Sequence, residues 1–392
     1  MKEAVIVSAV RTALGKVNGS LRNSRPEHTA TEVVKEAVRR AHGLKPEEID
    51  DLVMGCAFPE GEAGMNIGRN VALKAGLSSR VPGITVNRYC ASGLEAIAMA
   101  SQKVMCGFAD VVVAAGVEHM TVIPMGGNKP LPDPDLIQTW PQVYITMGLT
   151  AENVAQRFDI SRQDQDAFAL ESHRKAVKAL DAGVFKDQIL PLKVIDRVFE
   201  GDKAVRREKV FDTDECPRRE TSLEALSKLR GIFRPNGRVT AGNSCPMNDA
   251  AAAVVIMSKE KAAALGLKPM ATFRSIGVGG VDPDIMGIGP VVAVPKALKY
   301  AGISLEQVDL IELNEAFASQ SLYVMRTLGI DPGKLNVNGG SIALGHPLGC
   351  TGVYLTTKLL YEMERRKSRY GLVTMCIGGG MGAAGVFERE SM

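Results

Sequence analysis

The sequence has few of the features that mark nucleic-acid-binding, membrane or disulfide-rich proteins. Aromatic residues make up only 5% of the 392 residues, the formal net charge is +3, and no run of five or more basic residues occurs. Base stacking and binding of nucleic acid are therefore not expected. The longest apolar run, Ala250–Met257, has about eight residues, whereas a helix needs roughly 20 to span a bilayer. The first residues are charged, so no signal peptide is expected.

The seven cysteines follow no pairing rule. Their number is odd and no two have C-x-x-C spacing, and a chain of this length folds without disulfides. We therefore expect reduced thiols and a cytoplasmic location. Zinc-finger spacing is absent as well.

Short apolar runs alternate with helical patterns along the chain. We predict strands at residues 4–7, 52–54, 83–86 and 111–115, and helices at 29–42, 94–105 and 161–182. The strand at 111–115 is apolar on both faces, which is typical of a buried parallel sheet. The pattern predicts an α/β protein.

Two segments interrupt this alternation. Five prolines lie between Pro124 and Pro141, which argues against a helix or a central strand there. Residues 197–220 are rich in charges of both signs, and we expect a solvated, loop-rich excursion.

An internal repeat divides the chain. The similar segments, in the same order in both halves, are 48–58 with 307–317, 85–87 with 336–338, and 108–116 with 370–378. Any one pair could arise by chance, but three in register indicate a duplication. We predict two similar α/β domains, one formed by residues 1–120 with 246–268 and the other by 269–392, with 121–245 inserted in the first.

Cys90 is a candidate nucleophile. It follows one predicted strand and precedes a predicted helix by a few residues. A thiol at a helix N-terminus lies near unpaired N–H groups and the positive end of the helix dipole, and both favour the nucleophilic thiolate. A buried, inert cysteine would give the same local pattern.

His346 is a candidate base. It lies in a segment, residues 338–352, that holds five glycines, and Pro347 restricts it to extended conformations. A histidine fixed in this way can act as a base, although a purely structural loop histidine is the alternative.

Two further polar groups follow predicted strands. Cys376 ends the strand at 372–375 and precedes a glycine run that offers backbone N–H groups to an oxyanion; a plain turn is the alternative. Asn314 follows the strand at 310–313, where it needs buried partners or caps a helix.

All four residues lie just past the carboxyl ends of predicted strands, where α/β sheets form ligand sites. Two cysteines and a histidine could bind zinc, but the spacing fits no paired ligand motif. Nucleophilic catalysis by a thiol, a base and a second thiol fits better, and no metal is predicted.

The motifs around these four residues, with the segments 116–120, 240–244 and 281–287, resemble the thiolase family, specifically its degradative 3-ketoacyl-CoA thiolases, over the whole chain. The resemblance implies a thiolase-like fold in αβαβα layers. It also implies ping-pong acyl transfer without a tightly bound cofactor. Coenzyme A is a substrate, and 3-ketoacyl-CoA is cleaved to acetyl-CoA and a shortened acyl-CoA in fatty acid β-oxidation.

The resemblance assigns a role to each residue of the site. Cys90 would carry the acyl group, His346 would activate it, and Cys376 would exchange the proton on the acetyl-CoA α-carbon. Asn314, through a held water, and His346 would form one oxyanion site. The backbone N–H groups of Cys90 and Gly378 would form the other.

The family pattern also implies contacts to the substrate. Arg218 matches an arginine near the adenine end of coenzyme A, Ser244 and Cys245 match the pantetheine-binding stretch, and Met147, Met286 and Phe317 match residues near the acyl group. For the methionines, core packing is the alternative. Many relatives carry serine at position 245, and a thiol is a weaker hydrogen-bond partner.

The sequence is also compatible with other functions. An acetoacetyl-CoA thiolase that condenses two acetyl-CoA is one alternative, although Thr146 stands where biosynthetic thiolases usually have histidine. A decarboxylating ketosynthase and a non-enzymatic acyl-CoA or lipid-binding scaffold are the others. The family implies a homodimer or a homotetramer, and a hydratase/dehydrogenase partner of β-oxidation is compatible with it.

Overall fold

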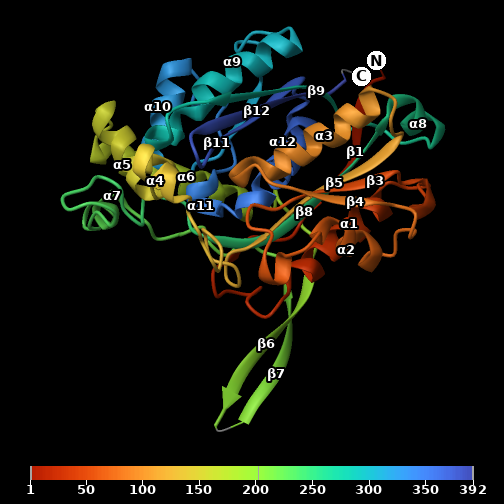
Figure 1. The fold of residues 1–392 in the computed structure, drawn as a ribbon, viewed down its shortest axis with the longest axis horizontal. Helices are drawn as coiled ribbons and strands as arrows, with labels where there is room; N and C mark the ends of the chain where they lie inside the picture. The colour runs from red at the N-terminus through yellow and green to blue at the C-terminus, as the bar shows by residue number, and fades with distance from the viewer. Residues whose placement is uncertain (1, 202, 391–392) are drawn as a thin grey trace.

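The computed structural model describes residues 2–201 and 203–390 (Figure 1). The strands are β1 (Ala4–Arg11), β2 (Gly15–Lys16), β3 (Asp51–Gly55), β4 (Gly83–Val86), β5 (Val111–His119), β6 (Leu192–Glu200), β7 (Lys203–Phe211), β8 (Asn248–Ser258), β9 (Ala271–Gly280), β10 (Leu310–Leu313), β11 (Tyr370–Ile377) and β12 (Met381–Glu388). The α-helices are α1 (Pro26–Arg40), α2 (Ile67–Lys74), α3 (Ser92–Met105), α4 (Pro134–Thr139), α5 (Met147–Arg157), α6 (Arg162–Asp181), α7 (Leu223–Ser227), α8 (Lys259–Ala264), α9 (Gly289–Ala301), α10 (Ala318–Leu328), α11 (Ser341–Leu344) and α12 (Leu348–Arg366). The predicted α/β class is confirmed.

The main sheet consists of two halves with the same connectivity. In the first, β3 pairs in parallel with β4 and β5, and antiparallel pairs then link β5 to β8 and β8 to β1. In the second, β10 pairs in parallel with β11, and antiparallel pairs link β11 to β12 and β12 to β9. The halves join where β1 meets β9 over two residue pairs. Two of the three repeated pairs occupy equivalent strands, β3 with β10 and β5 with β11. The third pair does not, because residues 336–338 form a turn after the single bridge of Leu335 to Ile311, where the first half has β4.

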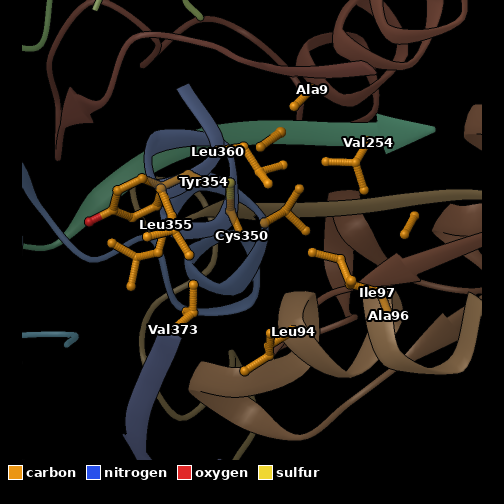
Figure 2. Packing of buried hydrophobic residues seen from close by; sticks show 14 of the residues in the cluster. Ala9, Leu94, Ala96, Ile97, Val254, Cys350, Tyr354, Leu355, Leu360 and Val373 are labelled. Atoms are coloured by element: carbon orange, nitrogen blue, oxygen red, sulfur yellow. The ribbon is translucent and has the colours of Figure 1, made fainter. Parts of the chain in front are cut away.

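The helices α3 and α12 lie between the two halves of the sheet. Figure 2 shows Leu94 and Ile97 of α3 in the same buried cluster as Cys350 and Tyr354 of α12. Separate clusters join α1 and α2 to the outer face of the first half, and α9 and α10 to that of the second. This gives the expected αβαβα layers (Figure 1).

Glycines allow α3 and α12 to meet at backbone distance. A Cβ atom on Gly93 would lie 2.8 Å from the carbonyl oxygen of Gly349, and one on Gly352 would collide with the backbone of Leu94. Because these residues lie in the first turns of the two helices, their contact sets the distance between the loops that precede them.

Two expectations for the inserted region were wrong in part. Residues 197–220 are not all loop, because β6 and β7 form a two-stranded hairpin that projects from the body of the protein (Figure 1); Asp202 lies outside the described residues. The proline-rich stretch contains the short helix α4, since Pro134 occupies its first turn, where a missing N–H costs nothing.

The inserted region is anchored by a buried ion pair. Arg11 donates to both carboxylate oxygens of Asp214 at 2.7 and 2.9 Å, and both side chains are buried. In the described part of the chain, no helix combines the length and the apolar character needed to cross a membrane.

The contact between α3 and α12 gives the first prediction. Gly352→Ala should lower the free energy of unfolding by about 1–3 kcal/mol, because the added methyl group overpacks the interface. Urea denaturation measures the change. Gly333→Ala is the control, since Gly333 is exposed and a Cβ there would meet only Asp331. Equal stability of the two variants would contradict the close contact.

Candidate active site

Cys90 lies on a tight turn between β4 and α3. It is the middle residue of a short 3-10 turn, Tyr89–Ala91, and Tyr89 has a positive φ of 44°, a conformation that costs energy for a non-glycine residue. The Ser92 side chain secures the turn, because its hydroxyl donates to the carbonyl of Tyr89 at 2.6 Å and accepts from the backbone N–H of Arg88 at 2.9 Å.

The thiol of Cys90 is protonated near neutral pH. Burial raises its pKa to about 11, and the hydrogen bond that the backbone N–H of Gly378 donates to it offsets only part of this rise. The structure thus brings Cys90 and Gly378 together. The position of Cys90 next to the N-terminus of α3 is therefore not enough to form the thiolate. A base must remove the thiol proton.

His346 is held by contacts on both ring nitrogens. Nδ1 lies 2.7 Å from the hydroxyl of Thr351, Nε2 lies 3.3 Å from Nδ2 of Asn314, and the backbone N–H donates to Asn248. Burial lowers the pKa of His346 to about 3, so the imidazole is neutral at pH 7 and able to accept a proton.

Neighbouring hydrogen bonds determine which nitrogen carries the proton. The hydroxyl of Ser341 donates to Oδ1 of Asn314 at 2.6 Å, which turns the amide Nδ2 toward His346. Because Nδ2 can only donate, Nε2 of His346 accepts, and the proton resides on Nδ1 facing Thr351. Nε2 is therefore the basic nitrogen.

Cys376 lies near the end of β11, beside the first thiol. Burial raises the pKa of Cys376 well above its ordinary value, and the nearby thiols of Cys90 and Cys245 raise it further. Its Sγ–H donates to Oε1 of Gln320 at 2.9 Å. Both cysteines are thus neutral thiols in one buried site.

An apolar cluster adjoins Cys376. Met286 and Phe317 belong to the same buried cluster as Cys376, and the partly buried Met147 and Cys245 pack against this cluster. Ser244 pairs through its backbone with Phe317, and its hydroxyl donates to the carbonyl of Thr240 at 2.7 Å. The predicted acyl-contact residues therefore lie together.

Arg218 lies apart from this cluster. It borders an open cavity of about 550 Å³ along α6, together with Arg174, Lys178 and Arg219. Its backbone N–H donates to Nδ1 of His173 at 3.1 Å. The lining also includes one carboxylate, Asp181, which pairs with Arg219 at 2.7 Å, so the cavity keeps a net positive charge, as a phosphate-bearing ligand requires. In the described part of the chain, no hydrogen bond or ion pair joins Arg218 to the thiols.

Three further side chains hold the site without any signal in the sequence: Thr351, Ser341 and Gln320. Thr351 and Ser341 lie inside the glycine-rich segment around His346, but nothing in the motif shows that their hydroxyls face His346 and Asn314. Among residues 2–201 and 203–390, no group of three or more His, Cys, Asp or Glu side chains could hold a metal ion.

Comparison with known families identifies the class. The family described as "Thiolase, N-terminal domain" matches residues 4–260, and "Thiolase, C-terminal domain" matches residues 267–389. The chain belongs to the thiolase family, and the resemblance found in its motifs is confirmed.

Individual relatives cover nearly the whole chain. A 3-ketoacyl-CoA thiolase of Bacillus subtilis (strain 168) is 54% identical over 99% of this chain and 100% of its own. The peroxisomal 3-ketoacyl-CoA thiolase 1 of Arabidopsis thaliana is 43% identical over 99% of this chain and 88% of its own. A crystal structure of the acetyl-CoA acetyltransferase of Bacillus anthracis is 40% identical, with a TM-score of 0.88, and covers 100% of this chain and 99% of that one.

The hydrogen bond to Nδ1 of His346 gives the second prediction. Thr351→Val should slow alkylation of Cys90 by iodoacetamide about tenfold, since loss of a partner for a buried polar group costs about 1–3 kcal/mol. Peptide mass spectrometry follows the alkylation. Thr357→Val, also on α12, is the control because the Thr357 hydroxyl donates to the carbonyl of Val353 rather than to His346. An unchanged rate in Thr351→Val would show that Thr351 does not hold the imidazole.

Proposed function

We propose that this protein is a thiolase that cleaves 3-ketoacyl-CoA with coenzyme A, releasing acetyl-CoA and a shortened acyl-CoA. The observation that carries the proposal is the pair of buried neutral thiols, Cys90 and Cys376, together with the close contact of α3 and α12, the helices that follow Cys90 and the buried neutral imidazole of His346. The 54% identity to a 3-ketoacyl-CoA thiolase supports the substrate class.

The first half-reaction transfers the acyl group to Cys90. Nε2 of His346 takes the thiol proton as Sγ attacks the 3-keto carbon, and the backbone N–H groups of Cys90 and Gly378 receive the developing oxyanion. The bond between C2 and C3 then breaks, which leaves an acyl thioester on the enzyme and the enolate of acetyl-CoA.

The enolate is the high-energy species of this reaction. Asn314, through a water, and protonated His346 donate to its oxygen, and oriented donors of this kind contribute on the order of 10²–10³ in rate each. Cys376 gives its proton to the α-carbon, so acetyl-CoA departs and Cys376 becomes a thiolate.

The second half-reaction restores both cysteines. The Cys376 thiolate takes the thiol proton of an incoming coenzyme A, whose sulfur attacks the acyl carbon. Cys90 leaves as a thiolate and recovers its proton from His346. Coenzyme A is consumed as a substrate, so the scheme needs no bound cofactor.

Condensation of two acetyl-CoA is the same chemistry in reverse and remains a second candidate. An acetyl-CoA acetyltransferase of Syntrophomonas wolfei, 44% identical over 99% of both chains, supports it. The cluster of Met147, Met286 and Phe317 beside Cys376 favours longer apolar acyl groups, and hence the degradative role in β-oxidation. The seven free cysteines support a cytoplasmic location.

We also propose that the protein is a dimer or a tetramer. β4 is an edge strand of the sheet, and Ile84 on β4 and Leu73 on the adjoining α2 are exposed. An uncovered edge of this kind invites pairing with another chain, and a second copy would cover it.

Activity gives the third prediction. Purified protein with coenzyme A should cleave acetoacetyl-CoA or a longer 3-ketoacyl-CoA, measured by loss of the 3-keto thioester absorbance, and Cys90→Ala should reduce the rate at least about 10³-fold because the covalent intermediate cannot form. Cys106→Ala, at an exposed thiol, should keep wild-type activity. Full activity of Cys90→Ala would contradict the mechanism. A wild-type protein without thiolase activity would favour the alternative of a non-enzymatic scaffold that binds acyl-CoA or lipid.

The basic cavity gives the fourth prediction. Arg218→Ala should raise KM for coenzyme A about tenfold with kcat little changed, because a charged contact far from the reacting atoms contributes equally to substrate and transition state. Steady-state thiolysis measures both constants. Arg206→Ala, exposed on β7, is the control, and an unchanged KM in Arg218→Ala would exclude the cavity as the adenine-end site.

A further inference from the structure

Gln320 is a fully buried amide that contacts the second thiol of the site. It lies in the first turn of α10, and its Oε1 is 2.9 Å from Sγ of Cys376. Room for it comes from Gly287, where a Cβ would lie 2.6 Å from the Cβ of Gln320. None of the roles proposed above uses this residue.

The hydrogen bonds around Gln320 run in one direction. The hydroxyl of Ser321 donates to the carbonyl of Phe317 at 3.0 Å, so it can only accept from Nε2 of Gln320, which lies 2.7 Å away. This fixes the amide with its oxygen toward Cys376. An amide oxygen can accept a proton but cannot donate one, so it favours the thiol over the thiolate.

We propose that Gln320 is a positioning residue that holds Cys376 in its protonated form until the enolate takes the proton. The inference rests on the proposed function and deepens it. The proton on Cys376 is the one that converts the enolate to acetyl-CoA, with the S–H bond breaking as the C–H bond forms. The electrons of the S–H bond remain on sulfur, so Cys376 becomes a thiolate. This thiolate faces the amide oxygen of Gln320, which carries partial negative charge. The repulsion promotes reprotonation of Cys376 by coenzyme A.

The other titratable groups near Cys376 are thiols. Cys90 and Cys245 both disfavour its thiolate, and burial acts in the same direction. Among the described residues, the groups that shift the pKa of Cys376 include no cation that would oppose these effects. Removing the amide oxygen should therefore make the thiolate easier to form.

The test separates the two cysteines by their pH profiles. Exchange of the acetyl-CoA α-protons in D2O, followed by NMR, reports the Cys376 thiolate, and iodoacetamide alkylation reports Cys90. In Gln320→Met we expect the exchange profile to move to lower pH by about one unit, as loss of one hydrogen bond implies, while the Cys90 alkylation profile stays in place.

Two further variants keep the test decisive. Ser321→Ala frees the amide and should move the exchange profile in the same direction by a smaller amount, which provides a result if Gln320→Met does not fold. Gln165→Met replaces another fully buried glutamine, on α6, and should leave both profiles unchanged.

The outcomes distinguish the inference from the proposed function. A wild type that catalyses neither exchange nor thiolysis overturns the function itself. An active wild type with an unmoved exchange profile in Gln320→Met and Ser321→Ala overturns only the role of Gln320. A uniform loss of rate without a pH shift also overturns it, because that is the result of a purely structural residue.

Discussion

The contact between the first turns of α3 and α12 is the constraint on which the rest of the site depends. Cys90 and His346 each stand two residues before one of these helices. Because Gly93 and Gly352 lack side chains, the helices meet at backbone distance. Their contact therefore also sets the distance between the loops that carry Cys90 and His346. The two loops are built differently, because β4 leads into the turn of Cys90 whereas the short helix α11 leads into the loop of His346. In the proposed mechanism the first loop carries the nucleophile and the second the base.

Burial then determines the charge state of the site. It keeps Cys90 and Cys376 as thiols and His346 as neutral imidazole, so the resting enzyme holds no buried charge on these groups. In the proposed mechanism, charge arises only when Cys90 gives its proton to His346, in surroundings of low polarity where the fixed donors of Gly378 and Asn314 act strongly. The neutral resting state and the stabilised enolate have the same physical origin.

Local sequence patterns predicted candidate reactive groups, but they did not predict the side chains that hold these groups in place. Cys90 and Asn314 follow strands and Cys376 lies near the end of one, as the local patterns predicted, and the repeat predicted the paired halves of the sheet. The prediction that His346 also follows a strand was wrong, because the short helix α11 precedes it. Thr351 and Gln320 could not be found in this way, because their partners are set by how loops from different elements pack. The β6–β7 hairpin was missed for a related reason. Its many charged residues are typical of a solvated loop, and only backbone pairing between the two strands forms the sheet.

The central claim is that Cys90 carries the acyl group between the two half-reactions. The most direct measurement is mass spectrometry of the protein mixed with acetoacetyl-CoA without free coenzyme A, quenched in acid and digested. The account predicts one acetyl group on the peptide that contains Cys90, and its loss when coenzyme A is added before the quench. Acetylation of Cys376 or of another residue instead, or no covalent adduct in an active preparation, would contradict it.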